Sequence, residues 1–231
     1  PARLAWGLRR VALSLGVRIF EHTRVTALAD QGAAVQLTTA HGRLRAGRAI
    51  LATHAFPPLL RRLRHFVAPI YDYALTTEPL TAAQLASVGW RRRQGVSDLG
   101  NRFHYYRITE DRRILFGGYD PVFHAGGRMT PALAQRPASF ETLARHFFTT
   151  FPQLSAVRFS HRWGGAVDAC TRFFAFHGRA CGGKVAYAAG YTGLGVSATR
   201  FAARVSLDLL AGARTELTGL ATVRRRPVPF P

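Results

Sequence analysis

The opening stretch PARLAWGLRRVALSLG has the hydrophobic pattern of an amphipathic helix. Apolar side chains recur there at helical spacing, at Leu4, Leu8, Val11 and Leu15. Gly16 suits the position just past a helix end, so the pattern predicts a helix of roughly four turns. Three strand candidates follow: VRIFEHTRV (17–25), AAVQLTTA (33–40) and GRLRAGRAILAT (42–53). Turns at Gly32 and His41-Gly42 would join them into a compact α/β unit.

From residue 61 onward the pattern changes to longer alternating segments. The strand candidates are APIYDYALTTEPL (68–80), NRFHYYRIT (101–109), RRILFGGYD (112–120) and AVRFSHRWGG (156–165). The polar pair Glu110-Asp111 between the second and third of these is a hairpin signal. A helix is expected over 139–151, with an apolar face of Phe140, Leu143, Phe147 and Phe151. The middle of the chain is therefore predicted to be an α+β region built on an antiparallel sheet.

The strand candidate 156–165 alternates between two kinds of side chain. One face would carry Val157, Phe159, His161 and Trp163, and the other Arg158, Ser160 and Arg162. This is the period of a half-buried strand. His161 is therefore expected to be a core histidine, whereas Trp163 is either a core residue or part of a binding surface.

A glycine-rich turn lies between two regular segments near the end of the chain, in VAYAAGYTGLGV. A buried strand is predicted over 184–189 and a helix over 197–210, with Gly190, Gly193 and Gly195 between them. Glycine permits positive φ and a close approach of the backbone to a ligand, toward which the helix N–H groups would point. The spacing G-x-x-G-x-G differs from the dinucleotide fingerprint G-x-G-x-x-G. The residues alone therefore allow either a ligand site or a tight turn with nothing bound.

Composition narrows the function classes only slightly. The chain has 231 residues, of which 48% are hydrophobic, and this suffices for a packed core. Its formal charge of +20 allows a basic nucleic-acid-binding module as an alternative, with aromatic and basic residues together in NRFHYYR. However, the arginines are scattered and Lys184 is the single lysine among 32 basic residues, which favours a general arginine bias. A positive field that attracts an anionic cofactor or substrate is a third interpretation.

The sequence gives no sign of a membrane span or a metal site. No apolar run approaches the ~20 residues that cross a bilayer, and the opening lacks a secretory pattern. A soluble, cytoplasmic protein without a membrane partner is therefore expected. Cys170 and Cys181 show no metal-ligand spacing, so no metal is expected either.

The glycine-rich stretch resembles a known family. VAYAAGYTGLGV is similar to the C-terminal flavin-binding segment of the D-amino-acid oxidase-like FAD-dependent oxidoreductases, the group of glycine oxidase, sarcosine oxidase and gamma-glutamylputrescine oxidase. Further stretches resemble the same family in order: PARLAWGLRRVALSLGVRIFEHTRV, AILATHAF, YALTTEPL, YYRITEDRRILFGGYD, FPQL and HRWGGAVD. The resemblance implies a mixed α/β and α+β fold, in which an incomplete Rossmann-like FAD-binding domain (1–60 and 161–231) surrounds an inserted antiparallel-sheet substrate domain (61–160).

The resemblance also implies a cofactor and a reaction. FAD would accept a hydride from a C–N bond of an amine or amino acid, and imine hydrolysis and reoxidation by oxygen or another acceptor would follow. Carried over position by position, the resemblance assigns cofactor contacts to Val25, Ala52, Thr53, Trp163, Gly164, Gly190, Tyr191, Thr192, Gly193, Leu194, Gly195 and Val196. The turn 190–196 would face the flavin ring, where its N–H groups would stabilise developing negative charge. A flavin-dependent demethylase, or a relative that passes a one-carbon unit to folate, is an alternative on the same fold.

No catalytic residue is assigned, but the substrate pocket has candidates. Tyr105 and Tyr106 are adjacent on one strand, so their side chains point to opposite faces and at most one would meet the substrate. Trp163 is a further candidate. In sarcosine oxidase-like members, a lysine two residues after the last glycine of the turn binds the substrate carboxylate; here that position is Ser197. A larger amine is therefore favoured over a simple α-amino acid. The setting DACTRF of Cys170 does not match the covalent flavin attachment of some members.

Members of the family open with a strand, a G-x-G-x-x-G turn and a helix. This sequence, which starts at Pro1, contains no counterpart of that unit. The resemblance therefore leads us to expect a fragment of a longer chain, truncated at both ends, without the unit that holds the pyrophosphate. An isolated chain of this kind would leave an apolar sheet edge uncovered. Poor FAD binding and a tendency to aggregate are the expected consequences.

Overall fold

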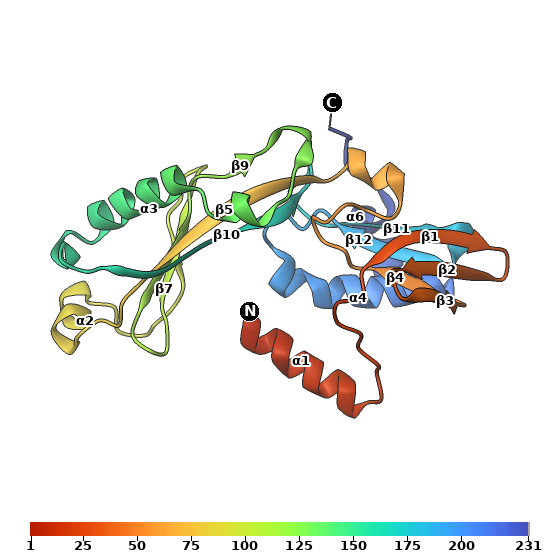
Figure 1. Cartoon of the computed structure of the whole chain (residues 1–231), viewed down its shortest axis with the longest axis horizontal. Coiled ribbons are helices and arrows are strands. Elements are labelled where there is room, and N and C mark those ends of the chain that lie inside the picture. Colours follow the sequence, from red (N-terminus) through yellow and green to blue (C-terminus); the bar gives the residue numbers. More distant parts are fainter. Residues whose placement is uncertain (231) are drawn as a thin grey trace. The chain divides into compact units, whose positions relative to one another are not determined.

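The computed structural model describes residues 1–230 and divides the chain into two compact units (Figure 1). Unit 1 comprises Pro1–Val67 and Ala169–Pro231, and unit 2 comprises Ala68–Asp168. Both boundaries lie several residues later than the predicted ones. The first is later because Leu63 and Phe66 pack into the core of unit 1. The second is later because the strand that begins at Phe159 continues to Ala169 without a break.

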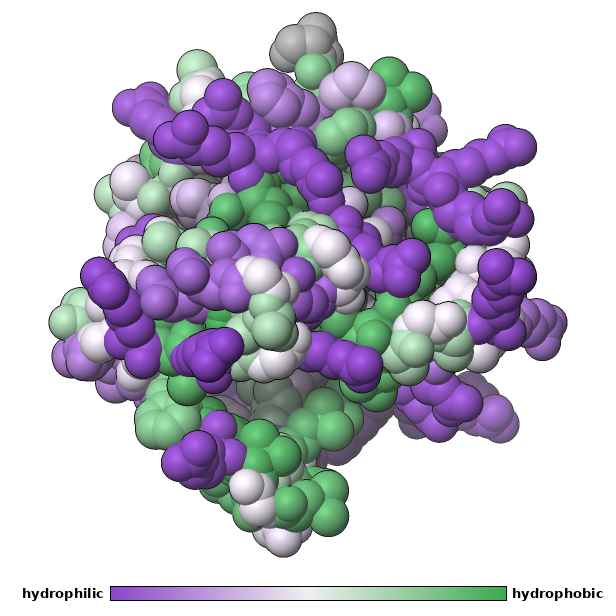
Figure 2. Space-filling model, turned by 90° about the vertical axis from the view of Figure 1, so that its right-hand side faces the viewer, coloured by the Kyte–Doolittle hydropathy of each residue, from purple (hydrophilic) through white to green (hydrophobic). Residues whose placement is uncertain are grey.

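The first helix of unit 1, α1 (Ala2–Ser14), confirms the predicted helix, and Gly16 follows it with a φ of 82°. None of its residues is buried, and Leu4, Trp6, Leu8 and Val11 are each more than half exposed. The helix lies lowest in Figure 1, and the lower end of the view in Figure 2 is largely apolar. Its apolar face therefore has no partner among the described residues.

The strand predicted over 17–25 is wrong. Residues 17–24 form no strand and are almost entirely exposed, because no neighbouring strand is hydrogen-bonded to them in the described chain. The strand begins instead at Val25. It opens a three-stranded antiparallel sheet of β1 (Val25–Gln31), β2 (Ala34–Thr39) and β3 (Gly42–Ala46). The first turn of this sheet includes Gly32, as predicted, and the second is Ala40-His41, one residue before the predicted His41-Gly42, because Gly42 already pairs with Thr39.

The second sheet of unit 1 has the order β11-β12-β4. β12 (Val185–Ala189) is antiparallel to β11 (Phe176–Ala180) and parallel to β4 (Ala49–Leu51). Every residue of β12 is buried, as its continuous apolar sequence predicts. Helix α4 (Gly195–Ala211) packs on β11 and β12 through Ala202 and Val205, which confirms the predicted helix over 197–210. Two short helices follow, α5 (Glu216–Gly219) and α6 (Ala221–Arg224).

Unit 2 is built on an antiparallel sheet of order β10-β5-β8-β7-β6, to which β9 adds beside β5. Its strands are β5 (Ala68–Thr77), β6 (Val96–Ser97), β7 (His104–Ile108), β8 (Ile114–Gly118), β9 (Val122–Phe123) and β10 (Phe159–Ala169). The helices of this unit are α2 (Ala82–Val88) and α3 (Pro137–Thr150). The β7–β8 hairpin turns at Glu110-Asp111, which confirms that prediction. Short 3-10 helices complete the chain at η1 (Arg61–His65), η2 (Ala125–Gly127), η3 (Pro131–Ala134), η4 (Pro152–Leu154) and η5 (Cys181–Gly183).

Helix α3 covers one face of the unit 2 sheet (Figure 1). The predicted apolar face of this helix is buried at Phe140, Leu143 and Phe147, which pack against buried strand residues such as Phe116. We call this side of the sheet the α3 face. The opposite side, which carries Tyr105, we call the Tyr105 face. The two faces use alternate residues of each strand.

Within residues 1–230, no helix has the length and hydropathy that a membrane crossing requires. The same residues contain no group of three or more histidine, cysteine or acidic side chains placed to hold a metal ion.

Candidate functional site

The glycine-rich turn lies at the carboxyl edge of the second sheet of unit 1. β12 ends at Ala189 and α4 begins at Gly195, so the turn between them spans 190–194. Gly190 and Gly193 have φ angles of 76° and 86°, a region that an L side chain rarely occupies. This explains why glycine occupies both positions.

The parallel pairing of β4 with β12 brings a second predicted segment to this edge. Strands that run parallel end at the same side of a sheet, and ligands of open α/β sheets bind there. Ala52 and Thr53 directly follow β4, and the turn 190–194 directly follows β12. The structure therefore places Ala52 and Thr53 at the same edge as the turn, although some 140 residues of sequence separate them, about a domain's length.

Cys170 packs against the backbone of the turn. Its side chain is 2% exposed, its backbone N–H donates to the Thr192 hydroxyl at 3.2 Å, and its Sγ lies 3.2 Å from the Gly190 carbonyl oxygen. A Cβ at Gly190 would lie 2.8 Å from Sγ, so the thiol fills the space that the glycine leaves. A second carbonyl, that of Phe174, lies 3.3 Å from the same sulfur. Cys170 is thus a packing residue under the turn.

The outer surface of the turn is apolar and rich in backbone N–H groups. Leu194 and Val196 are each 57% exposed, and a Cβ at Gly193 would meet no atom within 4 Å. No side chain caps the N-terminus of α4, because the N-cap residue is Leu194, whose side chain has no hydrogen-bond acceptor. The Ser197 hydroxyl donates to the Leu194 carbonyl at 3.3 Å. A helix of this length carries a partial positive charge at such an end. The edge therefore suits an apolar ring with an electronegative side.

The other three predicted cofactor residues lie on strands that do not adjoin the turn in sequence or in its sheet. Val25 opens β1 in the other sheet of unit 1 and is half-buried. Gly164 lies on β10 in unit 2, where a Cβ would lie 2.6 Å from the ring of Tyr73, so this glycine packs against the core. Trp163 precedes it on the Tyr105 face and is 41% exposed. Both β10 residues belong to unit 2, whereas the sequence-based boundary placed them with the turn.

The two adjacent tyrosines point to opposite faces, as predicted. The ring of Tyr106 is half-buried and packs against Trp90, Phe116 and Phe151 on the α3 face. Tyr105 instead reaches across the sheet, and its hydroxyl donates to Asp72 Oδ2 at 2.7 Å. Of the two tyrosines, Tyr105 is therefore the one whose side chain lies outside the aromatic core of the α3 face.

Asp72 is a polar residue that the sequence interpretation missed. It lies in the middle of β5, on the same face as Tyr105. Burial raises its pKa above the ordinary 3.8, against the opposing effects of hydrogen bonds from the Tyr105 hydroxyl and the Tyr73 backbone. Burial together with the charge of Asp72 raises the pKa of Tyr105. The available signal was a single acid within the otherwise apolar strand APIYDYALTT.

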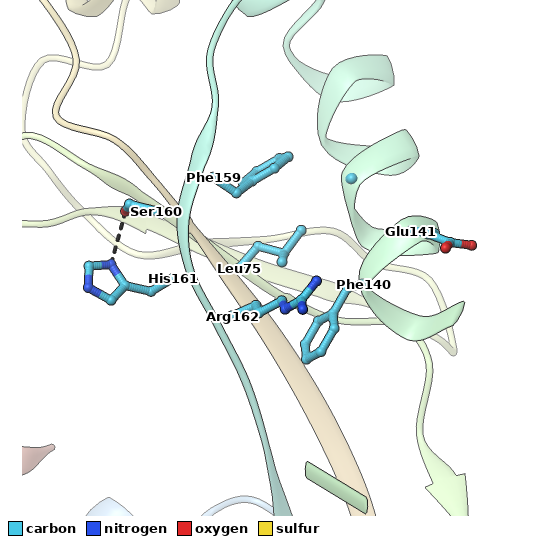
Figure 3. A pocket seen from close by; sticks show the side chains of 8 residues that line it. Leu75, Phe140, Glu141, Phe159, Ser160, His161 and Arg162 are labelled. Carbon is cyan, nitrogen blue, oxygen red and sulfur yellow. Dashed lines mark hydrogen bonds between the residues drawn. The ribbon is translucent and has the colours of Figure 1, made fainter. Parts of the chain in front are cut away.

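His161 is not the core histidine that strand alternation predicts. It is exposed, and its Nδ1 lies 2.9 Å from the Ser160 hydroxyl (Figure 3). The cause is an irregularity in β10. Phe159 packs against Phe147, and the guanidinium of Arg162 lies 5.4 Å from the Phe140 ring centroid, so both side chains lie on the α3 side. Because these two residues are an odd number of positions apart, Ser160 and His161 are both turned to the other side.

Beside this irregularity, α3 and β10 enclose a pocket of about 360 Å³. Its lining residues are Leu75, Phe140, Glu141, Ala144, Phe159, Ser160, His161 and Arg162 (Figure 3). Its lining combines apolar side chains with the charged residues Glu141 and Arg162. None of the predicted cofactor residues lines it.

Comparison with known proteins identifies the family of the chain. Residues 1–209 match the family described as FAD dependent oxidoreductase. The chain is 30% identical over 236 residues to the gamma-glutamylputrescine oxidoreductase of Escherichia coli, with 99% of this chain and 51% of that protein covered. It is 27% identical over 217 residues to the probable oxidoreductase OrdL of Haemophilus influenzae, with 92% and 47% covered. The chain thus spans about half the length of these relatives.

Solved structures show the same fold. A glycine oxidase from Geobacillus kaustophilus superposes with a TM-score of 0.76 at 17% identity, over 96% of this chain and 57% of that one. An iminodiacetate oxidase from a Chelativorans species gives a TM-score of 0.75 at 18% identity, over 97% and 57%. At these identities the likeness establishes the fold.

Proposed function

The chain belongs to the FAD-dependent oxidoreductase family, and from this we propose that its turn 190–196 holds the flavin of an enzyme that oxidises a C–N bond in an amine or amino acid. One observation carries the proposal. The parallel pairing of β4 and β12 brings Ala52, Thr53 and the turn to one sheet edge, beside the uncapped N-terminus of α4.

The residues at this edge fit a flavin. Bound FAD would supply the two-electron acceptor for the oxidation. Leu194 and Val196 offer exposed apolar contact to an aromatic ring and would keep water from it. The N–H groups of the first turn of α4 would stabilise negative charge that develops on the ring side facing them, as donors do in an oxyanion hole. Gly193 leaves room for close approach because its Cβ position is open.

An amine substrate is favoured over a simple α-amino acid. The position two residues after the last glycine of the turn is Ser197, which is exposed and hydrogen-bonded to the Leu194 carbonyl. A hydroxyl in this setting offers no positive charge to a substrate carboxylate. The relatives include enzymes named for gamma-glutamylputrescine, glycine and iminodiacetate, so we assign the substrate to the amine and amino-acid class.

The Gly193→Asn variant tests the proposal in the complete natural polypeptide that carries this chain. Asparagine tolerates positive φ better than other side chains, and the space around Gly193 is open, so the fold should persist. Its side chain would occupy the space assigned to the flavin. We expect FAD binding, measured by titration of flavin fluorescence, to weaken by about 10- to 100-fold, which is ~1.4 to 2.7 kcal/mol.

Gly212→Asn is the matched control. Gly212 ends the same helix with a φ of 69°, is exposed, and has no atom within 4 Å of its Cβ position. We expect it to bind FAD like the unmodified protein. Equal FAD affinity for both variants and the unmodified protein would contradict the placement of the flavin at the turn. Failure of the flavin-loaded protein to oxidise any primary or secondary amine would contradict the proposed reaction.

A further inference from the structure

We propose that a second pocket of unit 1, at the amino end of β12, binds a phosphate group, either inorganic phosphate or the phosphate of a small organic molecule. Its volume is about 500 Å³, and its lining residues are Arg62, Arg179, Ala180, Cys181, Gly182 and Gly183. All six belong to unit 1. The glycine-rich turn lies at the other end of β12, so this site is separate from the one assigned to the flavin.

The pocket lies where η5 connects β11 to β12. Arg62 comes from η1, 117 residues before Arg179 in the chain, and its Nη2 donates to the Arg179 carbonyl oxygen at 2.7 Å. The lining is therefore formed by two segments that the fold brings together, and not by a single exposed loop.

Contacts with the protein hold both guanidinium groups in place. That of Arg62 also lies 6.0 Å from the ring centroid of the buried Tyr187, a cation–π contact. Nη1 of Arg179 lies 3.4 Å from the Leu209 carbonyl oxygen in the last turn of α4. A guanidinium has five N–H donors, and each of these two uses one in its bond to a carbonyl. The other donors remain for a ligand.

The charges of the two arginines are not balanced. Among residues 1–230, no acidic side chain lies within ion-pair distance of Arg62 or Arg179, and the described lining contains no acid. Lys184, the next residue after the lining, does not add to this charge, because its Nζ lies 3.0 Å from Asp30 Oδ1. In a chain with 32 basic and 12 acidic residues, unpaired arginines alone indicate little. Here, however, both are fixed at one pocket.

The η5 part of the lining has little side-chain bulk. Gly182 and Gly183 have φ angles of 61° and 89°, a region that glycine occupies readily. Nη1 of Arg179 lies 3.9 Å from the position that a Cβ of Gly183 would take. Because no side chain projects from these two positions, a ligand can approach the backbone closely beside the guanidinium.

The ligand class follows from charge and shape. Guanidinium groups form bidentate hydrogen bonds with oxyanions. A phosphate monoester carries about −1.5 to −2 charges at pH 7 and has three acceptor oxygens, so it can accept from both arginines. A carboxylate, with one charge and two oxygens, would balance only one of them. A cationic amine would be repelled. The pocket volume falls within the ~300–1,000 Å³ typical of small-molecule sites.

Calorimetric titration with inorganic phosphate tests the site in the complete natural polypeptide. Ionic strength is kept constant, so that general attraction to a basic surface is screened equally in every sample. Arg62→Gln and Arg179→Gln should each weaken phosphate binding by about 10-fold or more, the loss of one charge-assisted contact. Arg61→Gln is the matched control, because Arg61 is exposed in the same 3-10 helix and does not line the pocket. It should change binding by less than about threefold.

Two further probes define the anion. If glycerol 3-phosphate binds more tightly than inorganic phosphate, with the same dependence on Arg62, the result supports an organic phosphate as the ligand. Equal or weaker binding supports inorganic phosphate itself. Acetate should bind at least about tenfold more weakly than phosphate. Acetate binding as tight as phosphate binding would contradict the assignment to a phosphate group.

Absence of phosphate binding would overturn the inference. Equal weakening by all three glutamine variants would also overturn it, since that result indicates attraction to the basic surface alone. Circular dichroism checks that the variants fold. Should a pocket variant not fold, hydrogen exchange of the unmodified polypeptide replaces it. Phosphate should slow amide exchange at 180–184 and leave 190–197 unchanged, and unaltered exchange at 180–184 would then refute the site.

Discussion

The two faces of the unit 2 sheet use adjacent residues for opposite purposes. On the α3 face, Tyr106 and Phe116 are part of an aromatic core with Phe147 and Phe151. On the other face, Tyr105 lies over a glycine to hold a carboxylate that has no counter-charge. The α3 face stabilises unit 2 by packing. The Tyr105 face instead retains the pair of Tyr105 and Asp72, in which burial disfavours the ionised carboxylate. Residues retained at a cost in stability are expected at functional sites.

The largest expected effect comes from the α3 face. Phe116 is fully buried, and Phe116→Ala should lower the free energy of unfolding by about 3 to 5 kcal/mol because it leaves a cavity among the rings of Tyr106, Phe147 and Phe151. Chemical denaturation followed by near-UV circular dichroism measures this. Leu115→Ala, on the other face of the same strand and only half-buried, should cost less than half as much. Equal costs would mean that the two faces do not differ in packing.

Unit 1 offers a related contrast between packing and charge. His177 on β11 is 5% exposed, and its Nδ1 has no hydrogen-bond partner among residues 1–230. Burial, and secondarily the charge of Arg172, lowers its pKa to about 4 from the ordinary 6.5. The unfolded chain therefore binds a proton more readily, and stability is lost as pH falls from 6.5 toward 4, by on the order of 2 to 3 kcal/mol.

His177→Leu should remove this acid-sensitive component. The measurement is the free energy of unfolding between pH 7 and pH 4 for the variant and the unmodified protein. His41→Leu, at an exposed turn between β2 and β3, serves as the control. If His177→Leu and the unmodified protein lose stability in parallel over this range, His177 is not the buried neutral group described above.

A smaller effect is expected at Gly117. A methyl group there would displace the Tyr105 ring, so Gly117→Ala should cost about 1 to 2 kcal/mol and weaken the hydrogen bond to Asp72. Gly165→Ala is the control, since no atom lies within 4 Å of its Cβ position. Thermal unfolding compares the two variants. Similar melting temperatures for both would show that the tyrosine does not need the glycine beneath it.

The smallest effect has the opposite sign. Because the pKa of Asp72 is raised in the folded chain, its stabilising contribution is present at low pH and is lost as pH rises and the group ionises. Asp72→Asn should therefore raise the unfolding temperature at pH 7, and the gain should vanish below pH 3.8.

Asp111→Asn should change stability in the other direction at pH 7. The Thr109 hydroxyl and then Arg113 lower the pKa of Asp111, so its contribution is present at neutral pH and is lost on acidification. Differential scanning calorimetry of both variants at two pH values tests the pair. A stability loss for Asp72→Asn at pH 7 would contradict the view that this carboxylate is kept at a cost.

Much of the fold followed from local pattern. Strand alternation fixed the opposite orientation of Tyr105 and Tyr106, and continuous apolar sequence identified the buried strand β12. Similarly, the 3.6-residue period placed Phe140, Leu143 and Phe147 on one side of α3. These features depend on residues close together in the chain.

The remaining features depend on partners far away in the sequence. His161 was misplaced because an irregularity in β10 depends on how that strand meets α3. Residues 17–24 have strand-like composition, but no strand pairs with them in the described chain. The pairing of Asp72 with Tyr105 could not be predicted from the sequence, because it depends on residues of neighbouring strands, Tyr105 itself and the Gly117 beneath its ring. The local sequence pattern does not specify such contacts between distant segments.

The central claim is that the turn 190–196, at the carboxyl edge of the second sheet of unit 1, holds the flavin. Hydrogen exchange tests this claim most directly. In the complete polypeptide, FAD should slow amide exchange at residues 190–197, where the backbone turns from β12 into α4. Exchange at η5, at the opposite end of β12, should stay unchanged. Protection of the turn with no change at η5 is the predicted result. FAD binding that leaves exchange at 190–197 unaltered would contradict the account.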